Sequence, residues 1–372
     1  MKILYIATVS GTINTFLIPH IQMLTDLGHT VDIACKISRP IKSKLLECGC
    51  KIFEMEFSRS PINKGNYNAY RKLKHIIRNE SYDLIHTHTP IASTLARLAC
   101  KNAKNIKVCY TAHGFHFYKG APLKNWLIYY PIERWLARYT DLLITINNED
   151  YLRAKKSFKA GNIEYVHGVG LDTKRFGEVV INKIEKRKEL GIPANSFVLL
   201  SVGELNKNKN HETVLRAVAK LNNPNLYYVI CGRGICKNYL EDLSRKLGIY
   251  NQVKLLGSRS DIAEICKTAD IFVFPSFREG LSVALMEAMA SGLPVVCSNI
   301  RGNKDLIENE KGGYLVKSDD FDEYASAIEK LINNYDIRIS FGKYNVCKVE
   351  MFSIVNVIKE MMKIYNQFIN LI

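Results

Sequence analysis

Two glutamates stand eight residues apart in Phe274–Ala288, the stretch whose residue types point most directly to chemistry. Glu279 shares a turn with Gly280, directly after an apolar run that is typical of a buried strand. Glu287 is the only charged residue between positions 281 and 300. A lone carboxylate among apolar residues is costly unless hydrogen bonds satisfy it. Vicinal sugar hydroxyls would do so, because they offer two donors to its two oxygens.

A helix is expected to begin near Ser282, just after this turn. The first amides of a helix have no partner within it and suit an anion such as a diphosphate, while Gly280 permits close backbone approach. Eight helical residues cover about 12 Å, so the two carboxylates could contact opposite ends of one nucleotide sugar. Spacing alone leaves a second interpretation open, in which Glu279 is an ordinary helix-start charge and Glu287 is exposed or ion-paired.

Short apolar runs alternate with segments of helical period through nearly the whole chain, which predicts parallel strands covered on both faces. The alternation breaks at a glycine-bearing turn near residue 170 and then restarts. The expected strands before the break are Lys2–Val9, Thr30–Cys35, Lys51–Phe57, Asp83–His88, Lys107–His113, Asp141–Ile146 and Asn162–His167. Those after it are Phe197–Gly203, Leu226–Gly232, Val253–Gly257, Asp270–Ser276 and Pro294–Asn299.

Two such runs predict an α/β fold of two Rossmann-like, doubly wound parallel-sheet domains that face each other across a cleft. The expected boundaries are 1–170 for the N-terminal domain and 171–350 for the C-terminal domain. Residues 351–372 are expected to form an amphipathic helix that packs back on the N-terminal domain. Ligands of open α/β sheets bind at the carboxyl ends of strands, so functional residues are expected just after strands.

Composition bounds the class of protein. Residues 1–170 hold 24 Lys and Arg against 12 Asp and Glu, whereas residues 171–372 hold 28 against 24. The excess in the first half favours an anionic partner, either nucleic acid, a phospholipid surface or a pyrophosphate-bearing substrate, with an ordinary solvated basic surface as the alternative. The ten cysteines lack zinc spacing and the apolar start lacks a cleavage site, which indicates reduced thiols and a cytoplasmic protein.

The glutamate pair resembles the motif of two glutamates separated by seven residues in the retaining glycosyltransferases of family 4. Other segments resemble the same family in the same order over essentially the whole chain. They are Gly203–Leu205 with Lys209–His211, then Cys231–Gly234, Leu256–Arg259 and Gly312–Val316. Thr111–Phe117 and Thr145–Asp150 look like the branch that builds capsular and exopolysaccharide repeat units. The resemblance implies the GT-B fold, retention of anomeric configuration and no required metal or other cofactor.

The resemblance also implies roles for individual residues. Glu279 would contact the transferred sugar, Glu287 the donor ribose, and Lys209 the diphosphate, stabilising charge as the leaving group departs. The remaining residues expected at the donor are Gly11, Gly203, Gly232, Gly257, Ser258, Arg259, Gly280, Leu281 and Ser282. Many members carry an arginine where this chain has Glu204, so that carboxylate is expected to point away from the diphosphate. Lys207 or Arg278 is then expected to supply the second positive charge.

Histidines close two of the expected strands in the first half, as His86 with His88 and as His113 with His116. No carboxylate or thiol at ligand spacing accompanies them, so no metal site is expected. By the resemblance His113 lies near the reacting centre and is catalytic. His88 and His116 are expected to line the acceptor side or to be structural.

The segment Phe117–Tyr139 holds both tryptophans of the chain among several tyrosines and basic residues. Aromatic and basic residues on an amphipathic helix suit a membrane interface, and a helix packed on its own sheet is the alternative. The residues expected to face the acceptor or an anionic membrane are His88, His116, Lys119, Lys124, Trp126 and Arg134. No nucleic-acid-binding module is recognised, so nucleic acid is not expected as a partner.

Together these patterns predict a cytoplasmic glycosyltransferase, peripheral on the inner face of the cell membrane. It would move a hexose or N-acetylhexosamine from a nucleotide-sugar donor, expected to be a UDP-sugar, to a lipid-linked or oligosaccharide acceptor, expected to be polyprenyl-diphosphate-linked. A UDP-sugar epimerase of the same architecture and a non-enzymatic sugar-binding protein are the alternatives. A dinucleotide dehydrogenase would carry Gly-x-Gly-x-x-Gly after the first strand, which Ser10–Asn14 lacks.

Overall fold

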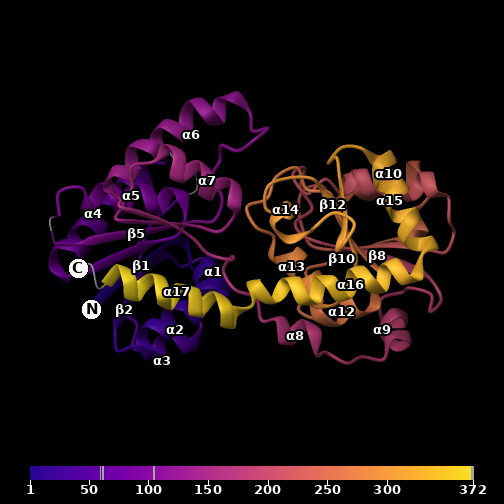
Figure 1. The fold of residues 1–372 in the computed structure, drawn as a ribbon, viewed down its shortest axis with the longest axis horizontal. Coiled ribbons are helices and arrows are strands. Elements are labelled where there is room, and N and C mark those ends of the chain that lie inside the picture. The colour runs from indigo at the N-terminus through magenta and orange to yellow at the C-terminus, as the bar shows by residue number, and fades with distance from the viewer. Residues whose placement is uncertain (59, 61–62, 104, 370–372) are drawn as a thin grey trace. The chain divides into compact units, whose positions relative to one another are not determined.

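A computed structural model describes residues 1–58, 60, 63–103 and 105–369. These residues form two compact units (Figure 1). The first unit combines Met1–Gly170 with the segment from Ile354 onward, and the second unit is Leu171–Ser353. Each unit has its own parallel sheet and its own hydrophobic core.

The first unit is built on a seven-stranded parallel sheet with the order β3-β2-β1-β4-β5-β6-β7. Its strands are β1 (Lys2–Val9), β2 (Thr30–Lys36), β3 (Ile52–Glu54), β4 (Leu84–Thr87), β5 (Lys107–Ala112), β6 (Leu142–Thr145) and β7 (Asn162–Tyr165). Its helices and short η turns are α1 (Ser10–Thr12), η1 (Ile13–Leu17), α2 (Ile18–Asp26), α3 (Ser43–Glu47), α4 (Lys64–Asn79), α5 (Pro90–Cys100), α6 (Leu123–Leu136), η2 (Ala137–Tyr139), α7 (Asn148–Ser157) and α17 (Ile354–Ile369).

Both faces of this sheet are covered, and β1 shows how. Its alternate residues Ile3 and Tyr5 join one core with side chains of α2 and α17. The intervening residues Leu4 and Ile6 join a second core with side chains of α4 and α5. Successive side chains of a strand point to opposite faces, so a strand buried on both faces reads as a continuous apolar run. Helix α17 therefore fills a place in the first unit, beside α2 (Figure 1).

The second unit is built on a six-stranded parallel sheet with the order β10-β9-β8-β11-β12-β13. Its strands are β8 (Phe197–Val202), β9 (Leu226–Cys231), β10 (Val253–Gly257), β11 (Ile271–Phe274), β12 (Val295–Ser298) and β13 (Gly313–Val316). Its helices and η turns are α8 (Thr173–Gly177), α9 (Lys183–Glu189), α10 (His211–Leu221), α11 (Lys237–Lys246), η3 (Tyr250–Gln252), α12 (Ile262–Thr268), α13 (Val283–Ala290), α14 (Asn303–Leu306), α15 (Phe321–Asn333), α16 (Tyr335–Val349) and η4 (Glu350–Phe352).

The predicted fold class, two doubly wound parallel-sheet domains, is confirmed by these two sheets. The predicted strands all form, with ends that differ by a few residues. The sequence analysis did not predict β13, because its short segment begins with two glycines and has little apolar length. The expected last helix is also not continuous. A 3₁₀ turn, η4, and the extended residue Ser353 separate α16 from α17.

Arg187 of α9 fastens this helix to the amino-terminal edge of the second sheet. Its guanidinium is 4% exposed and donates to the carbonyls of Ala194 (2.7 Å), Ser196 (2.8 Å) and Thr268 (2.7 and 3.0 Å). It also pairs with the Asp270 carboxylate at 2.8 Å. A planar guanidinium is the side chain suited to so many fixed acceptors.

Replacing Arg187 with methionine is expected to lower the free energy of unfolding by about 3–5 kcal/mol, because the buried Asp270 partner loses its cation. Equilibrium urea unfolding of the full chain measures this loss. The matched control is Arg216→Met, which removes the exposed pair between Arg216 and Glu212 in α10 and should cost less than about 1 kcal/mol. Equal losses in the two variants would contradict the role given to Arg187.

Candidate active site

Three glycines follow neighbouring strands at the carboxyl edge of the second sheet. Gly203 follows β8, Gly232 follows β9, and Gly257 ends β10. The Gly232 amide donates to the Gly257 carbonyl at 2.7 Å, and a Cβ atom on Gly232 would stand 1.7 Å from the Gly203 carbonyl oxygen. Gly257 has φ of +69°, which L side chains rarely adopt. The backbones of these loops therefore lie directly against one another.

The turn between β11 and α13 carries Glu279 and is fixed at both ends. Ser282 is the N-cap of α13, and its hydroxyl oxygen accepts from the Leu285 amide at 3.3 Å. Gly302 has φ of +79°, and a Cβ atom there would lie 2.1 Å from the Gly280 carbonyl oxygen. Arg301, which the sequence analysis did not single out, donates to the Glu279 carbonyl at 3.2 Å. The first amides of α13 thus open beside an acidic and a basic side chain.

Lys209 and Glu279 form an ion pair at this edge, although they stand 70 residues apart in the sequence. The distance between Lys209 Nζ and Glu279 Oε1 is 2.7 Å, and the two side chains are 19% and 13% exposed. The ammonium group also lies 4.6 Å from the centre of the Phe274 ring. The pair therefore sits in partly desolvated surroundings, where charge interactions are stronger than in water.

Two asparagines hold the Lys209 loop against the Glu279 turn. The Asn208 side chain donates to the Arg278 carbonyl at 3.0 Å, and the Phe277 amide donates to the Asn208 carbonyl at 2.8 Å. The Asn210 side chain donates to the carbonyls of Pro275 (3.3 Å) and Ser318 (2.6 Å). Asn210 itself has φ of +53°, a left-handed conformation that asparagine tolerates better than most residues. The left-handed backbone and these bonds together shape the loop that presents Lys209.

Glu287 lies half-buried on α13, two turns beyond Ser282. Its carboxylate makes no hydrogen bond or ion pair with any residue that the structure describes. Burial raises the pKa of Glu287 to about 7, against the opposing charge of Arg175. A carboxylate that pays for burial without a protein partner is available to a ligand that offers hydrogen-bond donors.

The charged residues expected around the diphosphate are placed as follows. Glu204 is exposed, and its carboxylate accepts from the Asn206 side chain at 2.9 Å. Lys207 and Arg278 are also exposed, and neither forms an ion pair with the described residues. Arg301 is only 8% exposed. It is therefore the basic side chain that the fold buries closest to the Glu279 turn.

Arg259, expected beside the base of the donor, is committed to carboxylates of its own unit. Its guanidinium donates to both oxygens of Asp261 (2.6 and 2.8 Å) and to Glu189 (3.0 Å). Hydrogen bonds from Arg259 and Lys186 hold the pKa of Asp261 well below its usual value. Ser258 is exposed next to it. The side chain at 259 thus shapes its loop, which leaves Ser258 and the loop backbone to face a ligand.

A separate cavity of about 930 Å³ opens in the second unit. It is lined by side chains that include Lys207, Ile235 and Phe277. Lys209 and the two glutamates are absent from the described residues that line it. This cavity is therefore distinct from the Lys209–Glu279 pair.

In the first unit, histidines gather at the carboxyl edge of the sheet. His88 Nδ1 and His113 Nε2 lie 3.4 Å apart, and the rings of His86 and His88 are 4.1 Å apart. Burial lowers the pKa of His113 to about 4 and the pKa values of His86 and His88 well below their usual range. These imidazoles are therefore neutral at pH 7. Gly11 lies in α1, directly after β1, with open space where a Cβ atom would stand.

Histidine clusters raise the question of a metal. No group of three or more His, Cys, Asp or Glu side chains arranged to hold a metal ion is found among residues 1–58, 60, 63–103 and 105–369. His116 stands apart from the other histidines of the edge, and its ring stacks on that of Tyr129 at 4.7 Å.

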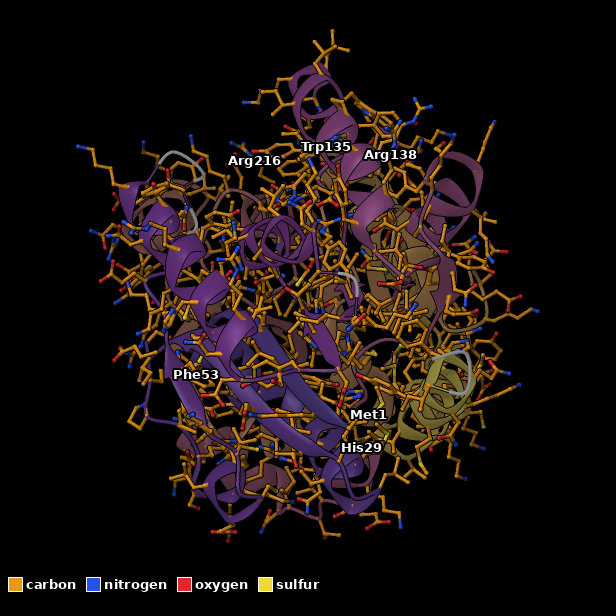
Figure 2. All side chains as sticks on the ribbon, turned by 90° about the vertical axis from the view of Figure 1, so that its left-hand side faces the viewer. Met1, His29, Phe53, Trp135, Arg138 and Arg216 are labelled. Carbon is orange, nitrogen blue, oxygen red and sulfur yellow. The ribbon has the colours of Figure 1, made fainter. Side chains whose placement is uncertain are left out.

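Helix α6 presents an apolar face to solvent. Leu123, Leu127, Pro131 and Trp135 recur every four residues and are all exposed, Leu123 by 72% and Leu127 by 68%. Trp135 ends the helix and Arg138 follows it in η2 (Figure 2). Residues at this spacing share one side of a helix. No described helix is long and apolar enough to cross a membrane.

The charges on α6 are all positive at its surface. Lys124 and Arg134 are exposed, whereas Glu133 is buried in an ion pair with Arg97 at 2.8 Å. Lys119 is exposed in the preceding loop. Trp126, expected on the membrane side, instead packs inward.

Trp126 has partners on both sides of its ring. It contacts Phe117 at a ring distance of 5.8 Å, and the Arg153 guanidinium lies 4.5 Å from its centre. The spacing pattern could not separate the two tryptophans, because both lie on the same helix and differ only in the face they occupy.

Comparison with known proteins gives the family. A family model described as "Glycosyl transferases group 1" matches residues 182–346, and one described as "Glycosyl transferase 4-like" matches residues 2–147. The putative glycosyltransferase EpsD of Bacillus subtilis is 38% identical to this sequence over 100% of the chain and 97% of its own length. The chain belongs to these glycosyltransferases.

This glycosyltransferase has further relatives of full length. An Escherichia coli UDP-Gal:alpha-D-GlcNAc-diphosphoundecaprenol alpha-1,3-galactosyltransferase is 29% identical over 94% of the chain and 92% of the relative. Anabaena Alr3699/HepE, solved in complex with UDP and glucose, matches with a TM-score of 0.81 at 20% identity over 99% and 100% of the two chains. Sucrose-phosphate synthase from Thermosynechococcus elongatus matches with a TM-score of 0.84 at 19% identity over both full chains. The predicted family and the GT-B fold are thereby confirmed.

The raised pKa of Glu287 predicts a specific dependence of stability on pH. Between about 4.5 and 7 the unfolded chain releases the Glu287 proton while the folded protein keeps it. The folded state therefore loses stability as pH rises through this window. Relative to the Glu287→Gln variant, which has no such proton, the wild type should lose on the order of 2 kcal/mol between about pH 5 and pH 8.

Urea unfolding of both proteins at the two pH values measures this difference, because all other titrating groups cancel. The exposed Glu329 of α15 gives the matched control, and Glu329→Gln should follow the wild type at both pH values. Parallel pH curves for the wild type and Glu287→Gln would mean that the Glu287 carboxylate is solvated in the folded protein.

Proposed function

We propose that this glycosyltransferase transfers a hexose or N-acetylhexosamine from a UDP-sugar, with retention of configuration, to a polyprenyl-diphosphate-linked acceptor. The observation that carries the donor site is the Lys209–Glu279 ion pair beside the start of α13. A cation, open helix amides and a carboxylate within one turn match the parts of a nucleotide sugar, since the diphosphate is anionic and the sugar offers hydroxyls. The UDP named for HepE and for the Escherichia coli relative supports the choice of base.

Each residue then has a task. Lys209 binds the diphosphate together with the amides at Gly280–Ser282, and Glu279 turns its free oxygen to hydroxyls of the transferred sugar. Glu287 accepts hydrogen bonds from the ribose. Because Glu279 already neutralises Lys209 in the protein without ligand, the bound diphosphate gains a cation whose position is fixed in advance.

The reaction itself needs little from side chains. The bond between the anomeric carbon and the diphosphate oxygen breaks while the acceptor hydroxyl attacks from the same side. The proton of that hydroxyl passes to the departing diphosphate oxygen, so no strong general base is required. His113, neutral at pH 7, offers a hydrogen bond at the reacting sugar and not a positive charge.

The acceptor is proposed to reach the first unit from a membrane. The outer face of α6 combines exposed apolar residues with Lys124 and Arg134 and no exposed acidic residue. Such a helix lies in the interface of an anionic bilayer, where apolar burial and charge attraction act together. The acceptor named for the Escherichia coli relative, a diphosphoundecaprenol-linked sugar, supports a lipid-linked substrate. The enzyme is accordingly proposed to be cytoplasmic and peripheral on the inner face of the cell membrane.

Lys209→Ala is expected to weaken binding of UDP-sugars about ten- to a hundredfold, because a hydrogen bond to a charged group is worth about 1.5–3 kcal/mol. Isothermal titration with UDP-glucose, UDP-galactose and their N-acetylhexosamine counterparts measures the loss for whichever donor binds. Lys220→Ala provides the control, since Lys220 is an exposed lysine of α10 that pairs with Asp322. Product analysis with the bound donor separates transfer from epimerisation. Undiminished binding in Lys209→Ala would refute the diphosphate assignment.

Leu127→Glu is expected to reduce binding to phosphatidylglycerol vesicles by about tenfold or more at low salt. The substitution removes an apolar side chain worth about 1.5–3 kcal/mol on burial and adds a repelling charge. Cosedimentation with vesicles measures the partition. Leu46→Glu is the control, because Leu46 of α3 is also exposed, by 58%, on a different helix. Equal losses in the two variants would show that charge alone, and not the face of α6, governs the association.

A further inference from the structure

The hydroxyl group of Tyr365 in α17 is buried among polar side chains of the first sheet. Tyr365 is 0% exposed, and its oxygen lies 2.8 Å from the hydroxyl oxygen of Tyr5 in β1. It also hydrogen-bonds Nδ1 of His86 in β4. The other ring nitrogen of His86, Nε2, lies 2.8 Å from the hydroxyl oxygen of Thr111 in β5. One side chain of the last helix therefore meets a chain of hydrogen bonds that crosses three strands.

The direction of these hydrogen bonds follows from counting hydrogens. The Tyr5 hydroxyl has the Tyr365 oxygen as its hydrogen-bond partner among the described residues, so Tyr5 donates to Tyr365. Tyr365 must then donate its own hydrogen to His86 Nδ1. His86 is neutral and carries one N–H, which is left on Nε2 and donates to Thr111. The opposite direction would bury the Tyr5 hydroxyl hydrogen without an acceptor, which is costly.

This chain bears directly on the histidines at the carboxyl edge of the sheet. The His86 ring packs on the His88 ring with centres 4.1 Å apart and an angle of 34° between the planes. His88 Nδ1 in turn lies 3.4 Å from His113 Nε2. His86 is thus the neighbour that sets the plane of His88, and His88 is the hydrogen-bonding partner of His113.

Neutral imidazoles make the position of each proton important. A neutral histidine has one donor and one acceptor nitrogen, and which is which depends on the hydrogen bond that the ring makes. Burial lowers the pKa values of His86, His88 and His113, so none of them settles the matter by becoming doubly protonated at pH 7. A donor that fixes the tautomer of His86 fixes the ring against which His88 and His113 are arranged.

We propose that Tyr365 is a positioning residue for His113: by donating to His86 Nδ1 it locks the tautomer and ring plane of His86, and through His88 it holds His113 in the geometry used for transfer. This inference rests on the role proposed above for His113. It assigns to the last helix a task beyond packing, because the apolar side chains of α17 would cover the sheet equally well without a hydroxyl at position 365.

The chain offers a matched control for the loss of a buried tyrosine hydroxyl. Tyr82, just before β4, is 2% exposed, and its hydroxyl donates to Asp32 Oδ2 at 2.7 Å. It belongs to the same unit as Tyr365 and contacts none of the described histidines of the edge by a printed bond or ring contact. Tyr82→Phe therefore reports the cost of losing such a hydrogen bond without disturbing His86.

The test compares Tyr365→Phe with Tyr82→Phe in the full-length protein. Tyr365→Phe is expected to lower kcat for sugar transfer about tenfold or more while leaving the KM for the donor near the wild-type value, because small misplacements at a reacting centre have effects of this size. Tyr82→Phe should leave both constants unchanged. The milder variant Tyr5→Phe, which leaves the Tyr365 hydroxyl in contact with His86, should retain most of kcat.

Nitrogen NMR of ¹⁵N-histidine-labelled protein gives a readout that does not need activity. In the wild type His86 should show a protonated Nε2 and an unprotonated Nδ1, and Tyr365→Phe should shift the signals of His86, His88 and His113. Tyr82→Phe should shift none of them. If the wild type shows these tautomers and shifts but transfers no sugar, the proposed function fails and the positioning inference for the three rings stands.

Two results would overturn the inference. One is Tyr365→Phe with wild-type kcat and unshifted signals of His88 and His113. The other is a wild-type His86 protonated on Nδ1. If Tyr365→Phe does not fold, Thr111→Val breaks the other end of the same hydrogen-bond chain, and unshifted His86 signals in that variant would equally contradict the assignment.

Discussion

The ion pair between Lys209 and Glu279 is the interaction on which the donor side of this molecule depends. It joins two loops that follow neighbouring strands, and it can form only because glycine backbones at 203 and 232 let those loops approach within contact. Partial burial strengthens the attraction but also makes it costly to remove one partner. The asparagines at 208 and 210 tie the loops through backbone carbonyls, so the pair is held in place by uncharged groups on either side.

The two units solve the problem of presenting polar groups in different ways. The second unit uses charges, namely an ammonium, two carboxylates and a buried guanidinium, arranged around open helix amides. The first unit uses neutral groups, because its imidazoles and hydroxyls lie where water is excluded and charged forms are disfavoured. A strongly anionic substrate suits the first arrangement. Orientation of an uncharged sugar hydroxyl suits the second, since hydrogen-bond direction and not net charge distinguishes correct from incorrect poses.

Sequence reasoning reached the strands, the family and the two glutamates because each depends on local order along the chain. Apolar runs mark β1 and β8 whatever lies across from them, and the spacing of Glu279 and Glu287 is fixed by one helix. Pairings between distant segments were out of reach. Nothing local indicates that Lys209 meets Glu279, that Arg259 is claimed by Asp261 and Glu189, or that Trp126 turns inward while Trp135 faces out. Tyr365 was hidden for the same reason, since a tyrosine in an amphipathic helix usually reads as core.

The path of the chain has a consequence for biosynthesis. Leu171 and Ser353 bridge to one another, so the second unit leaves and rejoins the first at nearly one point, in the manner of an insertion. During translation the second unit can acquire all its strands before the ribosome has made α17. The first sheet must wait for that helix with one hydrophobic face uncovered and with His86 lacking its tyrosine donor. Completion of the histidine side of the enzyme is thereby tied to the arrival of the last segment synthesised, which ensures that truncated nascent chains are incomplete at the edge where the acceptor is expected.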